Sequence, residues 1–189
     1  NLYDIKQTPT YSMRTLAFHE AIPGHHLQVA LNLENDNLSL YRRFGYGTSA
    51  FSEGWALYAE RLALESGLAN DPYDELGVLQ SELFRAVRLV VDTGIHFKRW
   101  TREEAMAYMK RITGMSDTEV STEIERYIVW PGQACSYKVG MLKILELRER
   151  AKQEMGENFD IKDFHSVVLD QGQPPLFIVE DLVSKMLEK

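Results

Sequence analysis

FHEAIPGHHLQ, residues 18–28, gathers three imidazoles and one carboxylate within eight positions, from His19 to His26. Neutral imidazole is the commonest protein ligand for transition metals. In many zinc hydrolases a glutamate beside the first histidine ligand is the general base. The stretch therefore predicts a catalytic metal site, with His19 as a ligand and Glu20 as the base.

The spacing of the histidines differs from the usual HExxH pattern, in which the two ligands lie four residues apart on one helical face. On an unbroken helix, His25 would lie about 120° off the face of His19, and His26 would lie about 10 Å further along the axis. Pro23 cannot donate a backbone hydrogen bond, and Gly24 tolerates unusual backbone conformations. We therefore expect a bulge at residues 22–24 that makes His25 the second ligand and leaves His26 beside the metal or facing substrate.

A third ligand is expected from SEGWALYAE, residues 52–60, in a predicted helix over 52–66 with Ser52 as its N-cap. Glu53 and Glu60 are seven residues apart and share a face with leucines. A carboxylate in an apolar stripe is costly unless it binds a metal or is paired. Two histidines and Glu53 would leave an open position for water, as in catalytic zinc sites. Glu60 is expected to hold a ligand histidine by its other ring nitrogen.

Four segments carry a resemblance to a known family: HEAIPGHHLQ, EGWALYAE, ERYIVWPGQACSYKVG and Phe164-His165. Together they resemble the bacterial domain of unknown function 885, whose members are predicted zinc metallopeptidases. That family is distantly similar to angiotensin-converting enzyme, thimet oligopeptidase and the thermostable carboxypeptidases. The resemblance implies one zinc ion on His19, His25 and Glu53, and a helical N-terminal portion that precedes this piece of the protein.

The related peptidases also carry an Arg-Tyr pair whose tyrosine binds the oxyanion formed during hydrolysis. Arg126-Tyr127 resembles that pair, so Tyr127 is our first candidate for this donor and Tyr137 our second. Gln133 and Lys138 are candidates for holding the substrate backbone or a terminal carboxylate.

Several further residues have both a functional and a structural interpretation. His96 is a candidate active-site donor or a core or capping residue, and His165 is a candidate site residue for which a structural hydrogen bond is favoured. Arg85 and Arg88 could form a solvated edge or a carboxylate clamp. Aromatic residues at helical spacing are usually core residues, which is what we expect of Trp55, Tyr58 and Trp130.

Composition places the chain among ordinary globular proteins. It has 189 residues, of which 44% are hydrophobic and 26% charged, and a formal charge of −7. The dispersed basic residues argue against nucleic-acid binding, and no stretch is long enough for a membrane span. We expect a single helical domain over 1–189, the C-terminal catalytic portion of a longer bacterial protein. Its location, in the cytoplasm or exported to the cell envelope, stays open.

The apolar periodicity is helical almost throughout, so we predict an all-α, multi-helix bundle with the metal site between two helices. Capping boxes begin at Thr101 and Ser116, and 35–51 is expected to form turns and a loop. The predicted helices span 12–34 with a break, 52–66, 72–100, 102–113, 117–130, 133–155, 160–169 and 176–188.

These patterns favour a zinc-dependent peptidase, either a carboxypeptidase, a dipeptidase or an oligopeptidase, that acts on a peptide or another small amide. Two alternatives stay open. A non-heme iron oxygenase would use Fe²⁺ on the same two histidines and one carboxylate, although it would not need Glu20. A non-catalytic metal-binding fragment would carry the site without the cleft that positions substrate.

Overall fold

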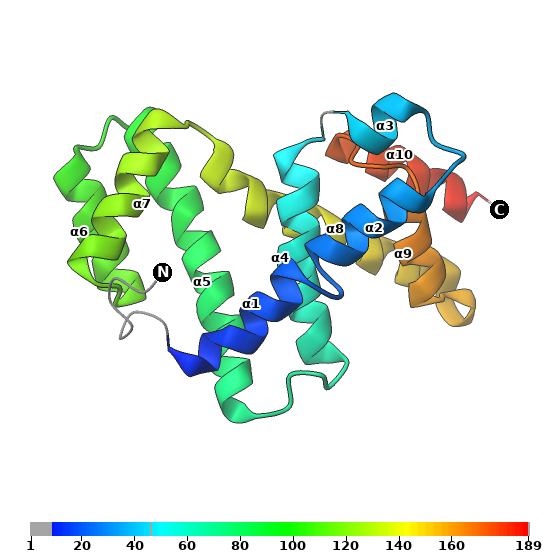
Figure 1. The fold of residues 1–189 in the computed structure, drawn as a ribbon, viewed down its shortest axis with the longest axis horizontal. Helices are drawn as coiled ribbons and strands as arrows, with labels where there is room; N and C mark the ends of the chain where they lie inside the picture. Colours follow the sequence, from blue (N-terminus) through cyan, green and yellow to red (C-terminus); the bar gives the residue numbers. More distant parts are fainter. Residues whose placement is uncertain (1–8, 46, 189) are drawn as a thin grey trace.

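The computed structural model describes residues 9–45 and 47–188, and within these ranges all regular structure is helical (Figure 1). The all-α prediction is therefore confirmed for this part of the chain. None of the helices described is long and apolar enough to span a membrane. The α-helices are α1 (Met13–Glu20), α2 (His25–Glu34), α3 (Leu40–Phe44), α4 (Ser49–Glu65), α5 (Pro72–His96), α6 (Arg102–Thr113), α7 (Asp117–Val129), α8 (Ser136–Met155), α9 (Ile161–Leu169) and α10 (Leu176–Leu187).

Helix α4 lies at the centre of the arrangement. Helices α1 and α2 follow one another across it, α8 packs against it, and α5, α6 and α7 form a group to one side (Figure 1). Helices α9 and α10 lie on the other side with α3 above them. The three segments that carry the predicted metal ligands therefore meet in the middle of the molecule.

The contact between α4 and α8 is unusually close because two glycines face each other. A methyl group at Gly54 would lie 2.5 Å from the Cα of Gly140, and one at Gly140 would lie 1.9 Å from the carbonyl oxygen of Ala50. Neither position can accept a side chain without moving a backbone. This contact sets the position of α4, and with it the position of Glu53.

Two hydrophobic clusters form the core. One lies among α4, α8, α9 and α10 and includes Trp55, Tyr58 and Phe164. The other lies among α5, α6 and α7 and includes Val91, Met109, Ile124 and Tyr127. The core assignment of Trp55 and Tyr58 is confirmed, whereas that of Trp130 is wrong, because its side chain is 58% exposed at the end of α7.

Most helix boundaries agree with the sequence, including the break near residues 22–24 and both capping boxes. Three predictions were wrong. Helix α4 begins at Ser49 after Thr48, so Ser52 is not its N-cap. The short helix α3 lies within residues 35–51, which were expected to form only turns and a loop. Tyr46, in the same stretch, falls outside the described residues. Helix α5 ends at His96 rather than near Trp100, whose ring folds back against Gly94.

We expect Gly140→Ala to destabilise the protein. In a helix, alanine is more stable than glycine by about 1 kcal/mol. Here, however, its methyl group would overlap the backbone of α4. Overpacking of this kind costs about 1–3 kcal/mol. Urea unfolding of the variant should give a lower free energy of unfolding than the wild type. A higher value would show that α8 can move away from α4 at little cost.

Candidate metal centre

Three side chains that could hold a metal ion come together from three helices. His19 lies in the last turn of α1, His25 is the first residue of α2, and Glu53 lies in α4. One donor atom from each lies within 4.8 Å of the other two. Oε2 of Glu53 is 3.5 Å from Nε2 of His19 and 3.3 Å from Nε2 of His25. Two imidazoles and a carboxylate are a ligand set that zinc accepts readily, so the residues fit the metal that the sequence predicted.

The Pro-Gly break is what brings the two histidines together. Helix α1 ends at Glu20 and α2 begins at His25, so four residues between them are not helical. A methyl group at Gly24 would lie 1.9 Å from the carbonyl oxygen of His19, which only glycine can avoid. The indole Nε1 of Trp55 donates a hydrogen bond of 2.9 Å to the carbonyl of Pro23. The bulge is thereby attached to α4, two residues after Glu53.

A buried carboxylate orients His19. Its Nδ1 lies 2.6 Å from Oε1 of Glu60, which is 1% exposed and follows Glu53 by two turns of α4. If Nδ1 donates to this carboxylate, Nε2 keeps its lone pair and faces His25 and Glu53. A carboxylate behind a histidine ligand is the usual outer partner in zinc sites and makes the imidazole a stronger ligand.

The charges within the group reinforce one another. Burial alone would raise the pKa of Glu53, but hydrogen bonds and charges from His19 and His25 outweigh burial and lower that pKa to about 2. Burial alone would lower the pKa of His19, but hydrogen bonds with Glu53 and Glu60 raise it above its ordinary value. Glu53 is therefore a carboxylate at neutral pH, the form that binds a cation.

Glu20 and His26 each follow one of the candidate ligands in sequence and are not part of the group. Glu20 is the last residue of α1, and its exposed side chain makes no hydrogen bond or ion pair with the other described residues. His26 is also exposed, one position after His25. Both are therefore available to a bound molecule.

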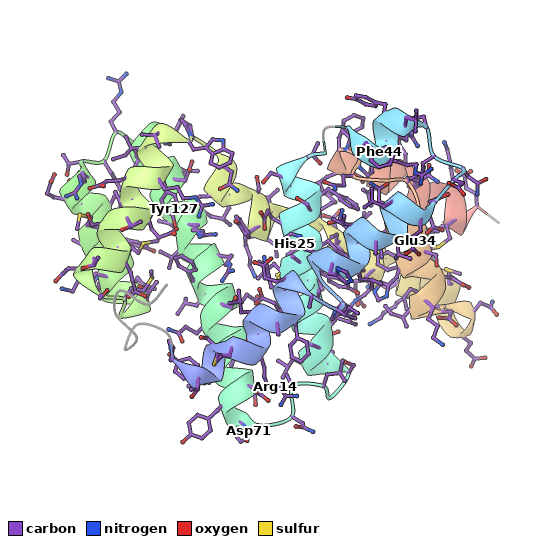
Figure 2. The ribbon with its side chains drawn as sticks, viewed as in Figure 1. Arg14, His25, Glu34, Phe44, Asp71 and Tyr127 are labelled. Atoms are coloured by element: carbon purple, nitrogen blue, oxygen red, sulfur yellow. The ribbon has the colours of Figure 1, made fainter. Side chains whose placement is uncertain are left out.

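The two candidate tyrosines have different surroundings. The ring of Tyr137 lies nearly parallel to that of His19, with 6.2 Å between their centroids. Tyr127 lies in α7, in the group formed by α5, α6 and α7, whereas His25 lies near the middle of the molecule (Figure 2). The Tyr127 hydroxyl accepts a hydrogen bond of 2.9 Å from Nε of Arg88 and donates one to Glu123. Of the two tyrosines, Tyr137 is therefore the one beside the metal group.

The other predicted site residues divide into two sets. Arg126 donates a hydrogen bond of 2.6 Å to Gln133, and its Nη2 is 3.5 Å from the hydroxyl of Tyr137, so these two residues lie beside that tyrosine. The remaining two are engaged elsewhere: Lys138 is paired with Glu82, and His96 contacts the carbonyl oxygen of Tyr127 at 2.9 Å.

His165 belongs to a buried polar network that supports Trp55. Its Nε2 lies 2.8 Å from the hydroxyl of Tyr58, which also accepts a hydrogen bond of 3.1 Å from Arg148. The His165 ring meets that of Trp55 edge-on, with centroids 5.4 Å apart. Helical periodicity predicts that Trp55 is a core residue but does not predict its hydrogen bond to the bulge, because periodicity indicates burial and not the partner of an indole N–H.

The fold and the site together define a class of protein. The described part of the chain is all-α, and two of its histidines and one glutamate could hold a metal ion. The chain belongs to a family of bacterial proteins of unknown function, DUF885, whose model matches residues 1–183. The sequence resemblance to this family is confirmed, whereas the more distant likeness to characterised zinc peptidases stays a prediction.

The solved structures that are similar to the chain include the following two. One is "the putative lipoprotein from Colwellia psychrerythraea", with 54% identity and a TM-score of 0.95 over 100% of this chain. The other is "a putative lipoprotein of unknown function from Shewanella oneidensis", with 32% identity and a TM-score of 0.86 over 96% of this chain. The chain spans 32% of the length of each of these two proteins. No curated protein matches the chain.

The network around His165 predicts a pH dependence of stability. Burial, together with the charge of Arg148, lowers the pKa of His165 to about 4 from its ordinary value near 6.5. Between these values the unfolded chain takes up a proton that the folded chain does not, so stability falls as the pH drops from 6.5 towards 4. Urea unfolding at several pH values in this window should show a smaller fall in His165→Gln than in the wild type. Equal falls in both proteins would contradict this prediction.

Proposed function

We propose that this protein is a zinc-dependent hydrolase of peptide bonds. The observation that carries the proposal is the group formed by His19, His25 and Glu53, with donor atoms within 4.8 Å of one another and Glu60 behind His19. Three protein ligands leave a coordination position for water, which is typical of catalytic rather than structural zinc sites. Bound zinc would lower the pKa of that water towards neutrality and so supply a nucleophile.

Glu20 is the proposed general base. It immediately follows His19 and is exposed, so its carboxylate can accept a proton from water and later deliver that proton to the leaving amine. Glu20 is exposed and pairs with no other described residue, so it can reach both water and the leaving amine, whereas Glu60 is hydrogen-bonded to His19.

Tyr137 is the proposed donor to the oxygen on which negative charge develops. Its ring lies against His19, and the nearby guanidinium of Arg126 favours hydrogen-bond donation by its hydroxyl. Although the sequence ranked Tyr127 first, its hydroxyl is already engaged by Arg88 and Glu123. We assign Tyr127 to the support of Arg88 instead.

Two alternative functions, an iron oxygenase and a non-catalytic metal-binding module, can each be tested. An iron oxygenase would use Fe²⁺ on the same three ligands, and metal content separates it from a zinc hydrolase. A non-catalytic metal-binding module would bind zinc and fail to hydrolyse peptides. The exposed carboxylate of Glu20 beside the group favours hydrolysis over both, because neither alternative needs a proton acceptor there.

The setting of the protein is proposed from its relatives. The two similar structures are described as those of putative lipoproteins, so we propose that this protein acts in the cell envelope. Because the chain spans 32% of their length, we also propose that a further, N-terminal portion of the same protein completes the substrate cleft. Short peptides or other small amides are the proposed substrates.

We expect about one zinc ion per chain in protein purified without chelator, measured by elemental analysis. His25→Ala should lose the metal because it removes a ligand, whereas the neighbouring His26→Ala should keep it and serves as the matched control. Iron instead of zinc would favour the oxygenase. Zinc lost only in His26→Ala would overturn the proposed ligand set.

In the same series, Glu20→Gln should keep its zinc and lose turnover of a peptide library by about 100- to 10,000-fold, the range typical of a general base. Loss of zinc in this variant would contradict the assigned role. Full activity with normal zinc content would exclude Glu20 as the base.

The two tyrosines can be separated by matched variants. Removing a donor to the developing oxyanion lowers kcat by about 100- to 1,000-fold, so we expect this loss in Tyr137→Phe with little change in KM. Tyr127→Phe should keep most of the activity. The reverse pattern, measured by steady-state kinetics on the same peptide, would restore Tyr127 as the oxyanion donor.

A further inference from the structure

Three guanidinium groups converge on Tyr137, the tyrosine that lies against His19. The Cζ atoms of Arg85 and Arg88 are 5.7 and 4.6 Å from the centre of its ring. Nη2 of Arg126 is 3.5 Å from its hydroxyl. Arg85 and Arg88 are three residues apart on α5, whereas Arg126 comes from α7. The metal group is therefore bordered by a concentration of positive charge.

The neighbouring carboxylates do not balance this charge. Glu123 lies 2.9 Å from Arg88 and 3.6 Å from Arg126 and so serves both. Arg85 forms no ion pair within 4.0 Å with any other described residue, although Glu60 and Glu53 act on it from further away. A divalent metal ion would offset the charges of Glu53 and Glu60. Three cations and one carboxylate then leave an excess of about two positive charges, which a bound anion would reduce.

Two of these arginines also keep N–H groups that have no acceptor among the described residues. Arg88 is 4% exposed, and its Nη1 has no hydrogen-bond partner in residues 9–45 and 47–188. Nε of Arg85 is likewise buried and unpartnered, while its Nη1 donates to Ser81. Stacking of both guanidinium groups on Phe84 stabilises their charge but satisfies no hydrogen bond. Buried donors without acceptors destabilise a fold, so their presence calls for an explanation in function.

Space for a ligand lies next to Arg85. This residue and Glu60 line a cavity of about 250 Å³ whose walls also include Leu16, Phe84 and Met115. Most of the exposed lining surface is apolar, and its charged residues are Arg85, Glu60 and Glu119. Glu119 accepts hydrogen bonds from Ser116 in the capping box of α7, and Glu60 links the cavity to His19. Burial lowers the pKa of Arg85 from its ordinary value, the direction expected for a cation that lacks a counterion.

We propose that Arg85, Arg88 and Arg126 bind a carboxylate of the substrate beside the metal, so that the enzyme prefers peptides with a free C-terminal carboxylate. Guanidinium groups bind carboxylates by paired hydrogen bonds, and the unpartnered N–H groups supply the donors. The apolar cavity takes the side chain of the terminal residue. This inference rests on the proposed peptidase function and narrows it to cleavage near the C-terminus.

The test measures binding, so that it does not depend on turnover. Calorimetric titration of the zinc-loaded Glu20→Gln protein with N-acetyl-Ala-Phe and with its C-terminal amide should show at least tenfold tighter binding of the free acid. Adding Arg85→Gln should reduce this ratio to near one, and adding Arg85→Lys should restore part of it. Arg111→Gln, which removes an exposed arginine of α6, is the control and should leave the ratio unchanged.

Equal affinity for acid and amide in the parent protein would overturn the inference. A third probe, N-acetyl-Ala-Glu-amide, identifies the source of the carboxylate: tighter binding of this probe than of the free acid would overturn the preference for the C-terminus. If the acid binds selectively but no peptide is hydrolysed by protein with an intact Glu20, the proposed function fails and the carboxylate site stands.

Thermal unfolding gives a second readout. A purely structural arginine would lower the melting temperature when replaced, whereas removal of a half-buried cation that forms no ion pair with another described residue should leave it unchanged or raise it. We therefore expect Arg85→Met to unfold at or above the wild-type temperature while losing selectivity for the acid. A clear fall in melting temperature together with unchanged selectivity would assign Arg85 to the fold alone.

Discussion

The close passage of the backbone at Gly24 over the carbonyl oxygen of His19 is the constraint on which the rest of the site depends. It turns one helix into two, α1 and α2, and places a histidine at the end of the first and at the start of the second. A glycine is required there because a methyl group would overlap the carbonyl. The candidate ligands His19 and His25 come together because the chain breaks its helix at this point.

Helix α4 supplies the other groups of the candidate metal site. Within two turns it supplies the carboxylate of Glu53, the indole that binds the carbonyl of Pro23, and the buried Glu60 that orients His19. Its own position follows from the glycine contact with α8. Ligand, anchor and orienting group therefore move together, and a rigid helix holds them in one geometry, which is what a metal site with few ligands requires.

The surroundings of Tyr137 show a different relation between stability and function. The structure has two hydrophobic clusters, but Arg85 and Arg88 near Tyr137 keep buried donors that have no partner among the described residues. Selection for folding alone would remove such features, since apolar residues of similar volume are often more stable than buried charges. Buried donors without partners are expected at sites where a protein binds another molecule.

The sequence alone was sufficient for the helical class, the break at Pro23-Gly24 and both capping boxes, because these depend on local spacing and backbone chemistry. It also indicated His19, His25 and Glu53, the last from a carboxylate in an apolar helical stripe together with the family resemblance. It could not decide which tyrosine lies beside the metal group. Tyr127 and Tyr137 occur in adjacent helical segments with similar patterns, and only the packing of α7 and α8 against α5 separates them. The tertiary structure likewise decided that three arginines meet around one ring, because charge balance depends on distances in space that no sequence interval encodes.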